Sequence, residues 1–126
     1  MDKIIIKTAN APEPIGPYNQ AVLAGETLYI SGQICIDPMT GELKKSDVQE
    51  ETHQAMQNLR AILVAANMGF NHVVKTTIFI TDMKKFSEIN EIYGKYFDGD
   101  FPARETVQVA ALPKFVNVEI SMIAVK

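Results

Sequence analysis

The chain has 126 residues, enough for one compact domain and too few for two ordinary ones. Apolar residues make up 47% and charged residues 21%, a composition typical of a globular protein and not of a disordered one. The net charge of -3 and the pI near 5.3 provide no general attraction to phosphate backbones, so we expect no nucleic-acid partner. A single domain over residues 1–126 is predicted.

The N-terminal residues, the single cysteine and the two histidines argue against a secreted, membrane-spanning, disulfide-bonded or metal-binding protein. Only three apolar residues stand between Lys3 and Lys7, too few for a signal-peptide core or a membrane span, so we expect a cytoplasmic protein without membrane contact. Cys35 is the only cysteine, which rules out a disulfide within the chain and favours a small buried hydrophobe. With His53 and His72 alone, no metal-ligand spacing arises, and neither metal nor cofactor is expected.

The N-terminal third predicts three short strands. Residues 4–7 form the first, and a rigid loop rich in proline follows over residues 10–17. Residues 21–24 and 27–31 flank Gly25-Glu26, a two-residue connection suited to a tight hairpin.

Two helices and three more strands are predicted after the hairpin. The first helix begins with a capping-box pattern, Ser46 with Gln49, and stops at Gly69. Its apolar positions recur at helical spacing: Val48, Ala55, Met56, Leu59, Ile62, Leu63 and Ala66. A strand is expected over 73–80, a second helix over 83–98, and strands over 105–110 and 116–125. This order favours an α+β fold, a β-sheet with both helices packed on one face.

The last predicted strand has two unlike sides. Val116, Val118, Ile120, Met122 and Ala124 share one side, and Asn117, Glu119, Ser121, Ile123 and Val125 share the other. The second side is polar at its start and apolar at its end, so we expect another subunit to bury part of it in a closed homo-oligomer.

Arg104 and Glu119 are the candidate catalytic pair. A guanidinium matches a carboxylate through two parallel hydrogen bonds, so Arg104 is a candidate anion clamp. Glu119, if held near Arg104, would orient a water and exchange protons with it. Taken singly, an exposed or salt-bridged arginine and an exposed sheet glutamate are the commoner roles for such residues. Strand alternation places Thr106 on the side of Arg104 and Glu105 on the other.

Four more residues are candidates for lining a cleft. Asn90 places an amide within the apolar stripe of the second helix, where it would either tie a loop or face a ligand. Tyr18 would close a pocket or pack its ring. Ser31 ends a predicted strand and Gly32 directly follows it, where glycine allows close approach to a ligand, although a β-bulge is the commoner explanation.

These residues lie within motifs that resemble one family, the RidA/YjgF reactive-intermediate deaminases. The resemblance spans nearly the whole chain through Gly16-Pro17-Tyr18-Asn19-Gln20-Ala21, Ser31-Gly32-Gln33 with Asp37-Pro38-x-Thr40-Gly41, Lys75-Thr76-Thr77, Phe101-Pro102-Ala103-Arg104 and Leu112-Pro113 followed by Val118-Glu119-Ile120. It implies a chorismate-mutase-like fold, a homotrimer and ligand clefts between subunits.

The resemblance also implies an activity. Members of the family hydrolyse 2-imino acids and their enamine tautomers, such as 2-aminoacrylate and 2-iminobutanoate, to 2-oxo acids and ammonia. Arg104 would then bind the substrate carboxylate and Glu119 would position the water. The remaining residues carried over as cleft lining are Tyr18, Ser31, Gly32 and Asn90.

The chain departs from the family at two positions. The residue after the arginine is usually small and here is Glu105, and the next, often cysteine in the deaminases, is Thr106. Glu105 is expected to point away from the cleft and Thr106 to line it. An alternative function is a non-catalytic module that binds small carboxylates in the same cleft. Ribonuclease or translation-inhibitor activity has been attributed to some relatives, but the acidic charge argues against it.

Overall fold

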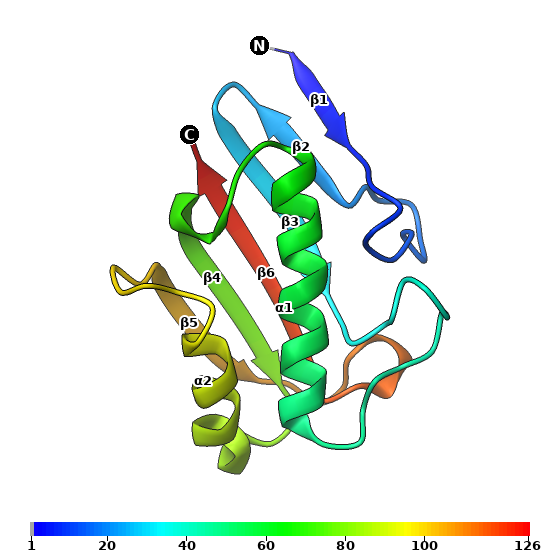
Figure 1. Cartoon of the computed structure of the whole chain (residues 1–126). Helices are drawn as coiled ribbons and strands as arrows, with labels where there is room; N and C mark the ends of the chain where they lie inside the picture. The colour runs from blue at the N-terminus through cyan, green and yellow to red at the C-terminus, as the bar shows by residue number, and fades with distance from the viewer. Residues whose placement is uncertain (1) are drawn as a thin grey trace.

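The computed structural model describes residues 2–126 as one mixed sheet with two helices packed on one face (Figure 1). The predicted order of three strands, helix, strand, helix and two strands is confirmed, and with it the α+β class. The strands are β1 (Lys3–Ile6), β2 (Ala21–Ala24), β3 (Thr27–Gln33), β4 (Val73–Ile80), β5 (Ala103–Gln108) and β6 (Val118–Val125). The helices are α1 (Val48–Ala65) and α2 (Phe86–Gly94), and short 3₁₀ turns cover Phe70–His72, Met83–Lys85 and Pro113–Phe115.

The strand order in space is β1-β2-β3-β6-β4-β5. Only β4 and β5 run parallel, joined by the crossover through α2, and the other pairs are antiparallel. The C-terminal strand β6 therefore lies inside the sheet, and β4 separates it from β5. Figure 1 shows α1 lying across the middle of the sheet and α2 beside β5.

The two faces of the sheet differ as the alternation predicts. Along β6, Val118, Ile120, Met122 and Ala124 are buried toward the helices, and the intervening residues are less buried. On the opposite face, which we call the open face, Ile5, Val22, Tyr29 and Ile123 stand in register across four strands. Tyr29 is 51% exposed, so no element within residues 2–126 covers this apolar row. Its cover by another subunit stays a prediction.

The ends of α1 correct two details of the predicted helix. The N-cap is Asp47, whose carboxylate accepts from the Glu50 amide at 2.8 Å, and Ser46 donates to the Glu50 side chain instead of forming a box with Gln49. At the other end Asn67, with φ 58°, adopts the left-handed conformation that we expected Gly69 to supply.

The other boundaries shift by a few residues. The predicted second helix over 83–98 begins as a 3₁₀ turn, and its α-helical part ends at Gly94 because the Tyr96 and Phe97 amides bond three residues back and tighten the chain. Strand β5 begins earlier than predicted and β6 later, with the 3₁₀ turn at Pro113 between them.

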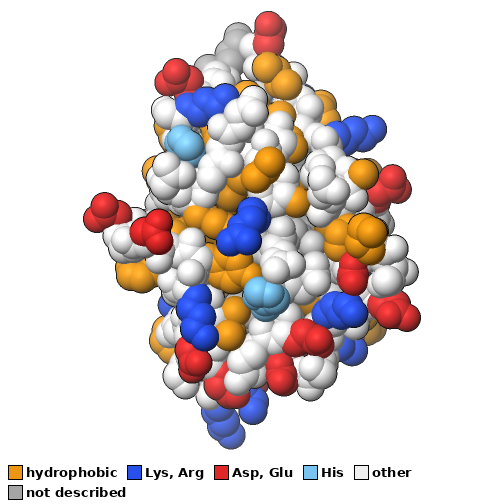
Figure 2. Space-filling view, viewed as in Figure 1, with side chains coloured by type: hydrophobic (Ala, Val, Ile, Leu, Met, Phe, Trp, Pro, Cys, Tyr) orange, Lys and Arg blue, Asp and Glu red, His pale blue; other side chains and the backbone are white. Residues whose placement is uncertain are grey.

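The helical face carries acidic and basic side chains in mixture, with small apolar patches between them and no continuous basic stripe (Figure 2). Within residues 2–126 no helix has the length and apolar character needed to cross a membrane.

Candidate functional site

Arg104 and Glu119 lie on opposite faces of the sheet. In the strand register Arg104 aligns with Thr76, which is fully buried beneath the helices, whereas Glu119 aligns with Phe79 on the open face. Because β4 also lies between their strands, one chain does not hold Glu119 near Arg104, and the condition set for the pair is not met within a single copy. Each residue instead belongs to its own hollow.

The first hollow, the Arg104 hollow, lies between α2 and the loop that leads into β5. It has a volume of about 280 Å³ and is lined by Asn90, Tyr93, Gly94, Phe101, Pro102 and Arg104. The guanidinium carbon of Arg104 lies 5.0 Å from the ring centroid of Tyr93 and 5.5 Å from that of Phe86. Both contacts are cation–π interactions, which hold the planar group in a fixed orientation. Within residues 2–126 Arg104 forms no ion pair.

The rings beneath Arg104 are themselves held in place. The Tyr93 hydroxyl donates to Thr76 Oγ1 at 3.0 Å, and burial raises the pKa of this phenol. Asn90 precedes Tyr93 by nearly one helical turn and is half-buried, with its side chain at the hollow. The amide expected within the apolar stripe therefore lies at the edge of the hollow and is not deeply buried.

Thr106 and Glu105 point to opposite sides of β5. The Thr106 hydroxyl is buried on the side of Arg104 and has no hydrogen-bond partner within residues 2–126. Thr106 was expected to line the cleft, but in a single copy it is not among the residues that line the Arg104 hollow. Glu105 lies on the open face, where it accepts from Thr77 and lies 3.0 Å from the Lys75 ammonium, and the Thr77 hydrogen bond foremost lowers its pKa. The prediction that Glu105 points away from Arg104 is confirmed, and its charge is matched by Lys75.

The second hollow, the Glu119 hollow, forms where β3 bulges beside β6. Ile30 pairs with Met122 and Gln33 with Ile120, so β3 carries one extra residue at Ser31-Gly32, the bulge considered from sequence. A Cβ atom on Gly32 would lie 2.7 Å from Glu119 Cδ, closer than atoms in contact allow. Glycine is therefore required for Glu119 to lie against this backbone, and burial there raises the pKa of the Glu119 carboxyl.

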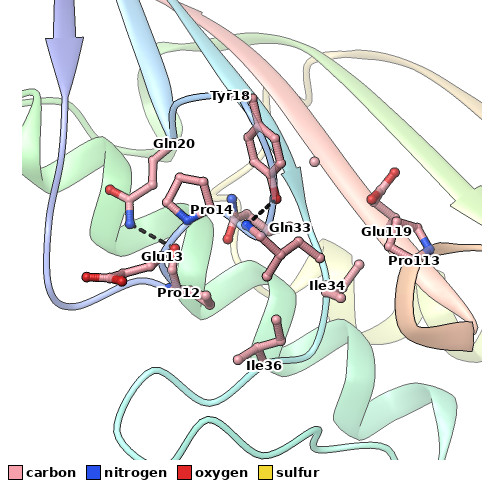
Figure 3. Close-up of a pocket in the computed structure, with 12 residues that line it drawn as sticks. Pro12, Glu13, Pro14, Tyr18, Gln20, Gln33, Ile34, Ile36, Pro113 and Glu119 are labelled. Atoms are coloured by element: carbon pink, nitrogen blue, oxygen red, sulfur yellow. Dashed lines mark hydrogen bonds between the residues drawn. The ribbon is translucent and has the colours of Figure 1, made fainter.

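The Glu119 hollow is small. It encloses about 40 Å³, and because a single water needs about 10–15 Å³, it has room for a few waters beside the carboxylate. The proline-rich loop supplies one wall and the turn before β6 the other (Figure 3). Its lining includes Pro12, Pro14, Ile15, Tyr18, Gly32, Gln33, Pro113 and Glu119.

Hydrogen bonds fix the loop that carries Tyr18. The Tyr18 hydroxyl accepts from the Ile15 amide at 3.2 Å, and Ser31 Oγ donates to the Asn19 carbonyl at 2.6 Å, so Ser31 braces this loop instead of lining the hollow. Gln20, which sequence reasoning missed, is buried and donates to the carbonyls of Ala11 and Pro12. Apart from its place in the motif over residues 16–21, its only signal was a polar residue directly before an apolar strand.

A family model described as Endoribonuclease L-PSP matches residues 8–126. A human protein named 2-iminobutanoate/2-iminopropanoate deaminase is 51% identical over 122 residues, covering 97% of this chain and 89% of its own length. The chain is a member of the RidA/YjgF family.

Solved structures of other family members have the same fold as this RidA/YjgF protein. The Rid-family protein YyfA from Yersinia pestis is 48% identical and superposes with a TM-score of 0.96, covering 99% of this chain and 100% of its own. The structure of E. coli TdcF with bound serine is 45% identical, with a TM-score of 0.94 and 98% coverage of both chains.

Proposed function

We propose that this protein is a cytoplasmic hydrolase that converts reactive 2-imino acids and their enamine tautomers, such as 2-aminoacrylate and 2-iminobutanoate, to 2-oxo acids and ammonia. The observation that carries the proposal is the Arg104 guanidinium, held over two rings at an open hollow and without an acidic partner in the described part of the chain. Such a group is prepared to take a carboxylate from a ligand. The deaminase names of relatives at about half identity and the serine in TdcF, an amino acid with such a carboxylate, support this.

The complete site is proposed to form between two copies in a homotrimer. One copy would supply the Arg104 hollow and its neighbour the Glu119 hollow. This is supported by the position of the two groups on opposite faces of one sheet, and by the uncovered apolar row that includes Tyr29 and Ile123. Burial of that row would join the copies.

In the assembled site, the substrate carboxylate binds Arg104 and the imine carbon faces Glu119. A water held by the Glu119 carboxylate attacks this carbon and gives one proton to the carboxylate, which passes it to the imine nitrogen, so the tetrahedral adduct carries a hydroxyl and an amine. Glu119 then takes the hydroxyl proton and gives it to the amine, and the C–N bond breaks to release ammonia and the 2-oxo acid. Imines hydrolyse in water without a catalyst, so orientation and proton transfer suffice for a useful acceleration.

The remaining candidates have supporting roles in this proposal. Tyr18 and Gly32 would line the water side of the cleft, and Asn90 the carboxylate side. Thr106 lies two residues after Arg104 on β5, and its buried hydroxyl would support this side of the cleft without lining the Arg104 hollow. Ser31 would act by holding the loop that carries Tyr18.

The test is ammonia release from imine that a pyridoxal-phosphate-dependent threonine dehydratase generates in the same solution. The wild type should accelerate release, and Arg104→Lys should reduce kcat/KM about 10- to 100-fold, because a lysine cannot form the two parallel charge-assisted bonds. Arg60→Lys is the matched control, since Arg60 also lies over two rings, Phe70 and Tyr96, outside both hollows. An Arg104→Lys variant as active as the wild type would show that this role of Arg104 is wrong.

Two other functions give distinct results in the same experiments. A non-catalytic module would bind 2-oxobutanoate saturably at the cleft without accelerating imine hydrolysis. The description of the matching family model points instead to RNA cleavage. The net charge of -3 and the mixed charges of the helical face oppose this, and RNA binding that persists at moderate salt would be needed to support it.

A further inference from the structure

Glu51 is a fully buried acid, and both oxygens of its carboxylate accept hydrogen bonds. It lies in the first turn of α1 with 0% of its surface exposed. Its Oε1 accepts from the backbone amides of Asn117 at 2.8 Å and Val118 at 3.2 Å, and its Oε2 accepts from Asn117 Nδ2 at 2.7 Å. A buried carboxylate is costly unless it is bonded in this way, and its place near a helix N-terminus also favours the negative charge.

The groups that Glu51 binds directly precede Glu119. Asn117 and Val118 form the entry to β6, and Asn117 is bonded on its other side to Thr81, which donates its amide to the Asn117 carbonyl and its hydroxyl to Oδ1. Glu51 therefore anchors the start of the strand from the helical side, while the Glu119 side chain leaves the same strand toward the open face.

Glu51 also lies close to the segment that follows Gly32. Burial foremost, and then the negative charge of Glu51, raises the pKa of Cys35 to about 11. Cys35 is itself fully buried, three residues after the glycine against which Glu119 lies. The Glu51 carboxylate thus bonds the entry of β6 and lies near Cys35, on the chain that leaves the β3 bulge.

We propose that Glu51 is a positioning residue for the reaction, which fixes the entry of β6 and through it the placement of the Glu119 carboxylate over Gly32. This inference rests on the proposed function of Glu119. A role in packing alone would not require an acid, but three N–H donors converge on residue 51 and need acceptors on both side-chain branches. A glutamine at position 51 would point its NH₂ group either at Asn117 Nδ2 or at the strand amides. In either case two hydrogen-bond donors face each other and one of them loses its acceptor.

The test compares Glu51→Gln, Asn117→Asp and the double variant. Glu51→Gln should lower kcat about 10- to 100-fold, because a shift of about 1 Å in a catalytic group has an effect of this size, and should leave KM nearly unchanged, since the Arg104 hollow is untouched. Asn117→Asp alone places a second carboxylate beside that of Glu51, and the repulsion between them should lower kcat at least as much. The double variant restores a donor facing an acceptor and should recover most of kcat.

A second readout does not depend on activity. The pKa of the Glu119 carboxyl, followed by NMR of its carboxyl carbon and assigned with Glu119→Gln, should fall toward the ordinary value in Glu51→Gln and rise again in the double variant. If the wild type hydrolyses no imine, the proposed function fails, and this measurement still decides whether Glu51 positions Glu119.

Ile62→Ala is the control for lost stability, because Ile62 is equally buried further along α1. Below its unfolding temperature it should retain the wild-type kcat. A folded Glu51→Gln variant with wild-type kcat and an unchanged Glu119 pKa would overturn the proposal. So would a double variant that regains thermal stability but not kcat. If Glu51→Gln does not fold, recovery of kcat in the double variant relative to Asn117→Asp decides the question.

Discussion

The Arg104 hollow and the Glu119 hollow belong to one sheet but are built in opposite ways. At Arg104 the chain places a permanent charge against the faces of Tyr93 and Phe86, without an ion-pair partner among residues 2–126, in an open hollow of about 280 Å³. At Glu119 it presses an acid against bare backbone in a hollow of about 40 Å³, where burial raises the pKa of the carboxyl.

The difference indicates that the two hollows have different roles. The open, charged hollow is suited to bind an anion that arrives from solution, and the narrow one to hold water beside a group that exchanges protons. Neither hollow contains the chemistry of the other, so the proposed hydrolysis of a bound imine would require that two copies bring them together. The predictions below test this comparison.

The largest effect should come from mixing two inactive variants. Arg104→Ala and Glu119→Gln should each lose most activity, and refolding equal amounts together should restore about a quarter of the wild-type rate. A site would draw an intact Arg104 from one copy with a chance of about one half and an intact Glu119 from its neighbour with the same chance. Ammonia release from each pure variant and from the mixture measures this.

Mixing the two proteins without unfolding is the control, since copies then exchange only by dissociation. If both groups of a site came from one chain, the refolded mixture would remain inactive, and the proposed division between copies would be wrong.

A smaller effect is expected where Glu119 meets the β3 bulge. Gly32→Ala places a Cβ 2.7 Å from Glu119 Cδ, so the carboxylate must move. We expect kcat to fall about tenfold or more, as for other misplaced catalytic groups, while 2-oxobutanoate still binds through Arg104. Steady-state kinetics and calorimetry separate the two quantities.

Gly94→Ala is the matched control for Gly32→Ala. Gly94 lines the other hollow, and a Cβ there meets no atom within 4 Å. A Gly32→Ala variant with the wild-type kcat would show that the position of the Glu119 carboxylate against Gly32 does not affect kcat.

Much of this arrangement follows from local pattern. The alternation along β6, the burial of Cys35 and the outward direction of Glu105 follow from a two-residue period and from residue chemistry, and the structure confirms them. The separation of Arg104 from Glu119 does not follow, because it depends on β4 entering between two strands that are consecutive in sequence. No local pattern specifies that insertion.

The two buried anchors were missed for a related reason. Glu51 occupies a position of the apolar stripe of α1, between Val48 and Ala55, so a charge at helical spacing was an available signal. Its hydrogen-bond partners lie at the start of β6, more than sixty residues away, and no local sequence pattern identifies them. Gln20 likewise holds carbonyls of a loop whose path only the fold determines.

The smallest effect concerns stability. Burial raises the pKa of Glu119 in the folded chain, so between its unfolded and folded pKa values the folded state binds more protons, and stability falls as pH rises through that interval. Glu119→Gln removes the ionisable group. Its unfolding temperature should match the wild type below the ordinary glutamate pKa of about 4.3 and exceed it near neutral pH. The increase would mean that the chain accepts a less stable fold to keep an acid where water is activated, as catalytic sites commonly do. Thermal unfolding across pH decides this, and a wild type that gains stability over Glu119→Gln as the pH rises would show that the carboxylate is stabilised by its surroundings.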